Sequence, residues 1–224
     1  MTSSSGRSSA VGQDNYHRWD LREELEYGVT DNYTVALYLN SKSERYANSA
    51  SADNSKFSFE GISLENKFLV LNPAEHAVGL SLYLEPSFSG DAAELEQKII
   101  LGQRHGDWKW AFNLSHATEW EDDFKEIVGE FGVSFGIARQ FNSRWSLGLE
   151  ARVKSEIVEY KNWENTVINV GPTLTYRTEK WWAALTVMPQ VRGWNHDGNA
   201  DNNTHLDLEH NERIQVRFVI GIDL

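Results

Sequence analysis

The chain has 224 residues, of which 40% are hydrophobic, and it carries no cysteine and a formal net charge of −12. No window approaches the ~18 consecutive apolar residues of a membrane-spanning helix, so a helical membrane protein is excluded. The absence of cysteine excludes disulfides and thiolate sites, and the negative charge argues against nucleic-acid binding, which needs a basic surface. Nine Trp, eight Tyr, ten Phe and 16 Gly without helical periodicity favour β-structure.

The first 17 residues are polar and rich in Gly and Ser. They have neither the apolar core nor the small-residue cleavage pattern of a signal peptide. We expect residues 1–17 to form a polar N-terminal segment or the remnant of an outer loop. The alternative is that residues 1–9 pair as a short edge strand. No Pro/Gly/Ser-rich linker follows, so residues 18–224 are expected to form a single β-barrel domain.

From residue 18 onward, apolar and polar residues alternate with the period of two that is typical of β-strands. Eleven strands are predicted, at 18–28, 33–42, 56–71, 77–89, 92–104, 108–120, 125–140, 145–160, 163–178, 181–195 and 206–224. Their connections alternate between tight turns, as at 105–107, and longer polar segments, as at 43–55 and 196–205. This order predicts an antiparallel up-and-down arrangement.

The stretch 146–160 shows the two faces most clearly. Glu150, Arg152 and Lys154 alternate with Leu149 and Val153. The segment 145–157 would span roughly 43 Å at about 3.3 Å per residue. Globular strands have a mode of about 5–6 residues, whereas an outer-membrane strand needs ~9–11 residues in hydrocarbon plus an overhang. The length therefore favours a transmembrane β-barrel.

Aromatic residues gather near the predicted strand ends. Trp108, Trp145 and Trp181 lie beside tight turns, and Trp120 and Trp163 lie near the opposite ends. Two such girdles around an apolar band are typical of outer-membrane barrels. The alternative is a soluble lipocalin-like barrel that binds an apolar ligand, in which the aromatics would be expected at mid-strand. The pattern predicts that apolar faces meet lipid and charged faces line a closed lumen.

An odd number of strands conflicts with closure, because the first and last strands would meet parallel. We therefore expect about eleven strands in this chain and twelve in a presumed parent, which would add a strand and a signal peptide upstream. Bacterial outer-membrane barrels have even strand numbers, short periplasmic turns and longer outer loops.

The segment "YHRWDLREELEYGVTDNYTVALYLN" (16–40) resembles a family of uncharacterised Gram-negative outer-membrane β-barrels, and "FEGISLENKFLVLNP" (59–73), "GLSLYLEPSF" (79–88) and "ELEQKIILGQ" (94–103) are similar to the same pattern. The family normally opens with a Trp/Glu-rich strand after a signal peptide, which this sequence lacks. The resemblance implies a fold and an outer-membrane location, and no activity.

By alternation, charged residues of both signs face the lumen. The predicted lumen or pore-lining residues are Arg22, Glu24, Glu26, Glu65, Lys67, Glu85, Glu94, Glu96, Lys98, Arg104, Glu130, Glu150, Arg152, Lys154, Glu156, Arg177, Arg192 and Arg217, and Asp20 and Lys109 share their parity. Such a balanced set can pair across strands or select solutes in a pore. The sequence predicts a passive narrow channel for small solutes or a structural envelope protein with an ion-paired lumen.

Other sites are weakly indicated. Asp197, Asn199 and Asp201 match the first ligand positions of an EF-hand-like calcium loop, but Asn202 stands where glycine belongs. An outer-membrane lipid hydrolase is a further alternative, with Ser115 as candidate nucleophile; its neighbour His116 would face the opposite way on a strand. We expect no catalytic residues and no cofactor. The expected partners are membrane lipids, lipopolysaccharide bridged by divalent cations to an acidic outer rim, and small solutes.

Overall fold

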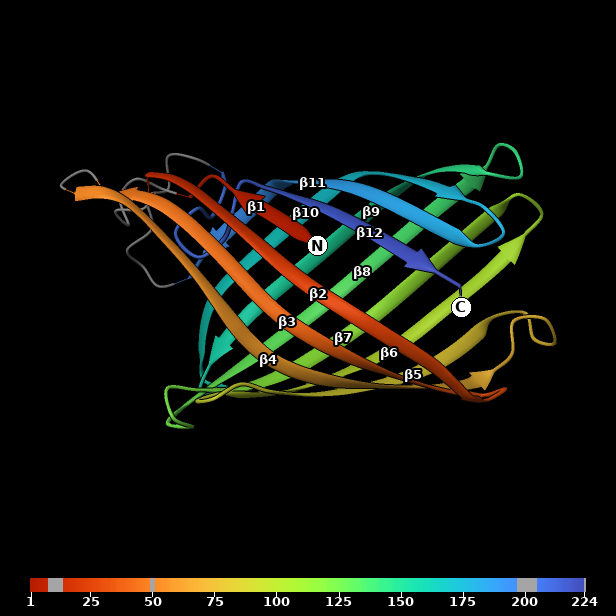
Figure 1. Cartoon of the computed structure of the whole chain (residues 1–224), viewed down its shortest axis with the longest axis horizontal. Helices are drawn as coiled ribbons and strands as arrows, with labels where there is room; N and C mark the ends of the chain where they lie inside the picture. The colour runs from red at the N-terminus through yellow and green to blue at the C-terminus, as the bar shows by residue number, and fades with distance from the viewer. Residues whose placement is uncertain (8–13, 49–50, 197–204, 224) are drawn as a thin grey trace.

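Consecutive strands of the computed structural model pair antiparallel and close into a barrel (Figure 1). The structure describes residues 1–7, 14–48, 51–196 and 205–223. The strands of this part are β1 (Thr2–Ser5), β2 (Asp14–Thr30), β3 (Tyr33–Asn48), β4 (Ser51–Leu71), β5 (Gly79–Phe88), β6 (Ala93–His105), β7 (Trp108–Glu121), β8 (Glu126–Gln140), β9 (Trp145–Val158), β10 (Asn162–Arg177), β11 (Trp181–Asn195) and β12 (Ile214–Ile222). None of the described residues belongs to a helix long and apolar enough to cross a membrane.

The barrel has two ends that differ in their connections. The short-turn end contains residues 31–32, 72–78, 106–107, 141–144 and 178–180, together with the C-terminal side of β12. The long-loop end is opposite and contains the connection from β11 to β12. In Figure 1 the strands β3 and β4 reach furthest at the long-loop end. Residues 43–48 and 51–55, predicted as part of a polar connection at 43–55, instead continue the ladder, with Arg45 opposite Ser55. Their polarity therefore marks an overhang, not a loop.

The four-residue strand β1 closes the ring between β2 and β12. Thr2 pairs with Arg217 on one side and Asp20 on the other, antiparallel in both cases. The barrel thus has twelve strands in the described part of the chain, and the predicted count of eleven is wrong. The predicted class, an antiparallel up-and-down barrel, is confirmed. A run of Ser and Thr carries no apolar alternation, which is why β1 had no clear strand signal.

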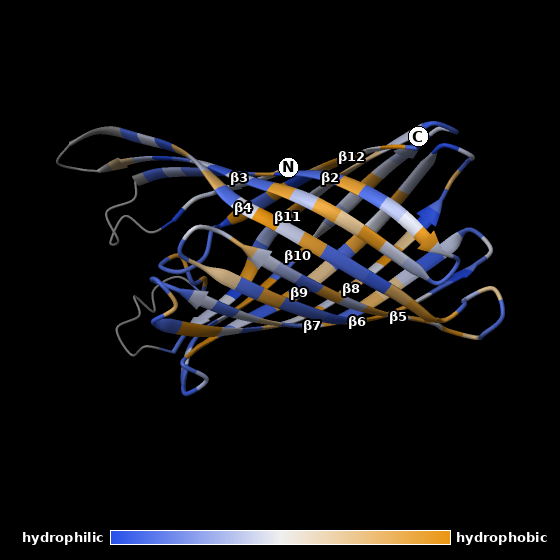
Figure 2. Cartoon of the chain, turned by 60° about the horizontal axis from the view of Figure 1, so that its bottom comes forward, coloured by the Kyte–Doolittle hydropathy of each residue, from blue (hydrophilic) through white to orange (hydrophobic). Residues whose placement is uncertain are grey.

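The outer surface of the barrel is apolar. Leu149 is 53% exposed and Leu25 is 63% exposed, and both lie on the outward face of their strands. Figure 2 shows hydrophobic and hydrophilic residues alternating along the strands. A soluble barrel would enclose these side chains, so the lipocalin-like alternative is excluded. The arrangement is that of a barrel which spans a membrane with its apolar face toward lipid.

Aromatic side chains flank this band at both ends. At the short-turn end the ring of Tyr176 lies 4.7 Å from Trp145 and 5.2 Å from Trp181. At the long-loop end the ring of Trp163 lies 5.7 Å from His196. Amphipathic rings at two levels match the headgroup regions of a bilayer.

A bulge at a glycine keeps the apolar residues of β4 on the outer face of the barrel. Gly61 has φ of +97°, and a side chain there would overlap the backbone of Phe88. The ladder skips Glu60, so Asn40 faces Gly61 while Ser41 faces Phe59. This bulge keeps Phe59 on the outer face, where it is 63% exposed.

Candidate functional site

Strand register places the predicted lumen residues on the inner face, with one exception. Arg192 follows a bulge in β11, where the register with β10 shifts by one residue. It pairs with the outward-facing Ile168, and its guanidinium lies 5.2 Å from the ring centroid of Trp194. The prediction that Arg192 faces the lumen is therefore wrong, because the extra residue at Val191 turns the next side chain outward.

A first cluster of ion pairs lines the inner face from β2 to β6. Arg22 donates to Glu85 Oε1 at 2.6 Å, and Lys67 lies 2.8 Å from Glu65 and 3.3 Å from Glu26. Glu85 and Glu65 are 3% and 5% exposed, so both carboxylates are buried among their partners. The contacts Arg22–Glu85 and Lys67–Glu26 tie strands that are not neighbours in the sheet, because side chains meet across the concave inner wall.

Tyrosine hydroxyls complete the first cluster. Tyr38 donates to Glu65 Oε2 at 2.8 Å, and Tyr83 donates to Glu85. Lys98 lies 4.2 Å from the centroid of the Tyr83 ring and pairs with Glu96 at 2.7 Å. Each of these carboxylates is therefore contacted by a cation or a hydroxyl donor, as buried charge requires.

A second cluster occupies the inner face from β8 to β12. Glu150 accepts from Arg152 at 2.9 Å and from Arg217 at 3.0 Å. Lys154 lies between Glu130, at 2.5 Å, and Glu156, at 2.9 Å. Among the described residues no ion pair joins a residue of the first cluster to one of the second. The interior is thus lined by two separate charged networks.

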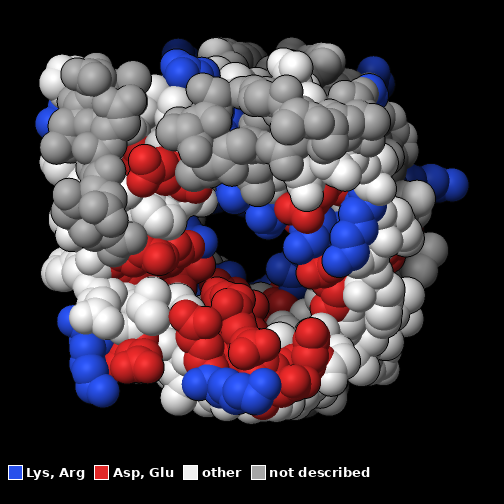
Figure 3. All heavy atoms as spheres, turned by 90° about the vertical axis from the view of Figure 1, so that its left-hand side faces the viewer, with Lys and Arg blue, Asp and Glu red and all other residues white. Residues whose placement is uncertain are grey.

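Toward the long-loop end the inner face becomes acidic. Glu94 and Glu119 lie directly opposite each other on β6 and β7, and neither contacts a cation in the described part of the chain. Like charges in this position are unfavourable for a sheet. Glu119 shares the inward parity of Ala117 and Ser115 on β7. Figure 3 shows acidic side chains gathered below a hollow at the centre of this end.

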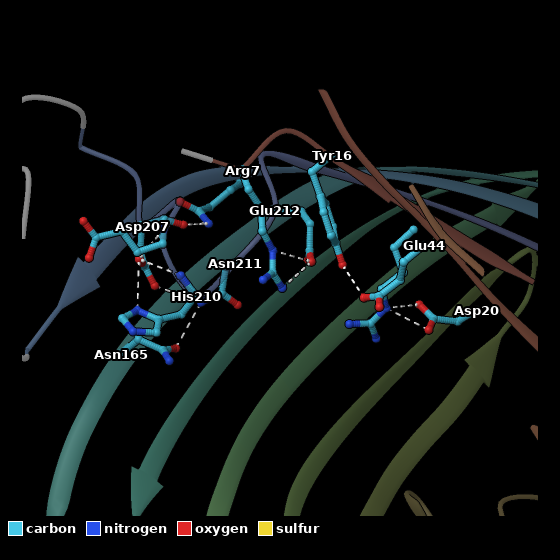
Figure 4. A network of polar contacts seen from close by, with 12 residues as sticks. Arg7, Tyr16, Asp20, Glu44, Asn165, Asp207, His210, Asn211 and Glu212 are labelled. Carbon is cyan, nitrogen blue, oxygen red and sulfur yellow. Dashed lines mark hydrogen bonds and ion pairs between the residues drawn. The ribbon is translucent and has the colours of Figure 1, made fainter. Parts of the chain in front are cut away.

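Residues 205–213, here called the inturned segment, lie against the inner wall of β10 and β11 (Figure 4). The predicted strand 206–224 is therefore too long at its start, since β12 begins at Ile214. Gln190 donates to the Asp207 carbonyl at 2.8 Å, and Asn211 donates to Asn165 Oδ1 at 3.1 Å. Two backbone bonds, from Gly193 to the His205 carbonyl and from Gln190 to the Arg213 carbonyl, also join the segment to β11. The segment therefore narrows the long-loop end from one side.

The inturned segment is folded around one buried carboxylate. Asp207 is 3% exposed. Its carboxylate accepts from the Glu209 backbone at 3.2 Å and from the Asn211 side chain at 2.9 Å. Glu212 pairs with Arg7 at 2.9 Å, which anchors the segment to the stretch that follows β1.

A cavity of about 480 Å³ lies inside the barrel at the short-turn end. Its lining residues are Arg104, Asp107, Lys109, Gln140, Ser143, Arg144, Ser146, Thr175, Arg177, Trp182 and Ala184. This space, here called the basic vestibule, contains four cationic side chains and one carboxylate. The sequence indicated Arg104, Lys109 and Arg177 as lumen residues, but not Arg144, which belongs to a turn and has no strand parity.

The hydrolase candidates Ser115 and His116 lie on opposite faces of β7. Ser115 faces inward opposite Lys98 and Gly132. His116 faces outward and bonds the Tyr160 hydroxyl at 2.9 Å, so the two residues do not form a nucleophile–base pair. Within the described ranges no three His, Asp or Glu side chains are grouped to hold a metal ion. The calcium candidates Asp197, Asn199 and Asp201 lie outside the described residues.

Several solved structures are similar to this chain, among them an outer membrane channel and a porin. The outer membrane channel from Pseudomonas putida F1 shares 12% identity and a TM-score of 0.62, over 99% of this chain and 92% of that chain. The NanC porin shares 10% identity and a TM-score of 0.56, over 100% of this chain and 98% of that chain. At such identities the likeness supports the barrel fold alone. None of the curated proteins matches the sequence.

The sequence match is to a family whose function is unknown. The model of that family matches residues 3–99 and 102–224, which is nearly the whole chain. It agrees with the resemblance to uncharacterised barrels seen in residues 16–40 and 59–103. The chain belongs to DUF6662, a family of unknown function.

Proposed function

We propose that the protein is a passive, narrow channel for small solutes in the outer membrane of a Gram-negative bacterium. The short-turn end would face the periplasm and the long-loop end the exterior, as in other outer-membrane barrels. The observation that carries the proposal is the separation of the two charged clusters. Each lines its own side of the inner wall, and no ion pair between described residues crosses from one to the other.

This separation favours a pathway over a fully interlocked interior. A hollow lies at the long-loop end of the barrel (Figure 3), and the basic vestibule lies at the other end. Polar walls keep such a passage wetted, and charged side chains along it would select among solutes. A barrel of this strand number is also wider than the eight-stranded kind, whose interior side chains fill.

The same ion pairs support a second candidate, a structural envelope protein with an ion-paired lumen. Glu65 and Glu85 are buried among partners, which stiffens the wall on that side. The acidic residues of the long-loop end, such as Asp122 and Asp123, would meet lipopolysaccharide through bridging divalent cations. No enzymatic role is proposed, because Ser115 and His116 face opposite sides of β7.

Conductance in planar lipid bilayers tests the channel. The expected result is a stepwise current after insertion of the full chain. Gly136 faces the lumen, and no other residue's heavy atom comes closer than 4.0 Å to a side chain placed there. Gly136→Trp should therefore reduce the unit conductance.

The matched control is Phe135→Trp, which adds the same indole group on the outer face, where Phe135 is 42% exposed. It should conduct as the unmodified protein does. Absence of current from correctly folded barrels would leave the structural envelope role in place of the channel. Equal conductance for Gly136→Trp and the unmodified chain would contradict a pathway that passes Gly136.

A further inference from the structure

The cations of the basic vestibule differ from the other cations on the inner wall. In the two clusters, Arg22, Lys67, Lys98, Arg152, Lys154 and Arg217 each contact a carboxylate. In the vestibule, Arg104, Lys109, Arg144 and Arg177 form no ion pair with any described residue. With Asp107 as the single carboxylate of the lining, four positive charges and one negative charge leave an excess of three positive charges.

Several contacts hold these cations in place without neutralising them. Arg104 donates through Nη2 to Gln140 Oε1 at 2.8 Å and through Nε to the Gly106 carbonyl at 3.2 Å. The Arg177 backbone N–H donates to the Arg144 carbonyl at 2.8 Å, which ties the turn between β8 and β9 to the end of β10. The guanidinium of Arg104 is therefore oriented by neutral acceptors, and its charge remains available to a ligand.

The shape of the vestibule suits a small organic molecule. Its volume of about 480 Å³ falls within the range of roughly 300–1,000 Å³ that is usual for ligand sites. Ser146 and Thr175 contribute hydroxyl groups, and Trp182 contributes an aromatic ring to the same lining. The planar guanidinium group of arginine can donate two parallel hydrogen bonds to a carboxylate or phosphate group.

We propose that the basic vestibule binds small organic anions through carboxylate or phosphate oxygens, and that it concentrates them at the short-turn end of the pathway. The inference rests on the proposed channel function for its role, but the site itself can be tested without conductance. A fixed excess of positive charge in a partly enclosed cavity raises the local concentration of anions. Arg104 and Arg177 are the principal ligands, with Lys109 and Arg144 contributing charge.

Calorimetric titration of the folded barrel in detergent micelles with citrate, at low ionic strength, tests the site. Citrate should bind the unmodified chain, and Arg104→Gln/Arg177→Gln should weaken binding at least tenfold. The control is Arg139→Gln, which removes a cation at the same end of the barrel. Arg139 lies beside Trp108 at 5.8 Å from its ring centroid and lines no part of the vestibule. The control should bind citrate within twofold of the unmodified chain.

Competition distinguishes the two sources of oxyanion. Stronger displacement of citrate by gluconate than by inorganic phosphate assigns the site to carboxylates, and the reverse assigns it to phosphates. Glucose, which is neutral, should displace nothing. If glucose displaces citrate as well as gluconate does, the oxyanion assignment is overturned. Lys109→Gln serves as a second variant should the double variant fail to fold, and it should weaken citrate binding severalfold.

The outcomes for the site and for the channel are separable. Citrate binding that depends on Arg104 and Arg177, in a barrel that carries no current, overturns the channel and retains the anion site. A conducting barrel that binds no citrate, or that binds it equally in all variants, overturns the anion site and retains the channel.

Discussion

Arg22 of β2 donates to Glu85 of β5 at 2.6 Å, although β3 and β4 lie between these strands along the wall. The contact bridges the concave inner face, so it depends on the curvature of the closed barrel and not on strand pairing alone. Glu85 is 3% exposed and has no cationic partner other than Arg22 among the described residues.

Replacement of Arg22 by Gln should therefore destabilise the barrel. The lost charged hydrogen bond leaves a buried carboxylate, and the expected cost is about 1–3 kcal/mol. Equilibrium unfolding by denaturant in lipid vesicles measures it. Arg22→Gln/Glu85→Gln, which removes both charges, should recover part of the loss. If Glu85→Gln instead adds its own full cost in unfolding free energy to that of Arg22→Gln, the two changes are independent. That result would contradict the pairing of Arg22 with Glu85.

Glu150 is the carboxylate shared by Arg152 and Arg217, so Glu150→Gln should leave two lumen cations without a carboxylate partner. The expected result is a shift of the reversal potential toward anion selectivity in a salt gradient. The shift should shrink at about 1 M salt, where the Debye length is about 3 Å. Glu179→Gln, in the turn between β10 and β11, makes the same change of charge outside the ion-pair clusters and should give a smaller shift. Equal shifts in both variants would argue against a lumen role for Glu150.

Asp207 organises the inturned segment, so Asp207→Ala should loosen it. Its side chain is 1% exposed, and its carboxylate accepts hydrogen bonds from within the segment. We expect a larger or noisier unit current, because the segment narrows the long-loop end. Single-channel recording provides the measurement, with Asp31→Ala in the turn between β2 and β3 as control. Traces of the Asp207 variant that cannot be distinguished from those of the control would show that the segment does not restrict the pathway.

Val133 lies near the middle of the outer face of β8, where it is 39% exposed and pairs with Val153 and Leu114. Val133→Arg should cost about 2–4 kcal/mol in a bilayer, whereas a charge near the interface costs about 0–1 kcal/mol. Ile127→Arg, near the end of the same strand, is the matched control. The unfolding free energies of both variants in vesicles check the depth dependence, and equal costs would contradict the assigned lipid-facing surface.

The alternation of side chains was sufficient to predict most of the fold. Glu150 and Arg152 were expected inward and Leu149 outward, and strand register agrees because each side of β9 has one chemical character. The errors arise where alternation carries no information. Arg192 follows a bulge that the local sequence does not announce, and the Ser/Thr-rich β1 has no apolar face.

The candidate site was less predictable than the fold. The inward position of Arg104 and Arg177 follows from parity, but their lack of ion-pair partners depends on which side chains lie across the lumen. Which side chains meet across the lumen is set by barrel curvature and strand stagger. The contact between Arg217 and Glu150, across two intervening strands, is an example. The inturned segment was likewise missed, because its polar residues find partners on distant strands.

Ring closure in this protein depends on very few residues. The strand β1 contributes four paired positions to each neighbour, while β2 and β12 extend well past it toward the short-turn end. Detachment of β1 would convert the cylinder into a curved sheet with two free margins. Exposed margins of this kind recruit further strands, so the same four residues that complete the wall also keep one molecule from pairing with the next.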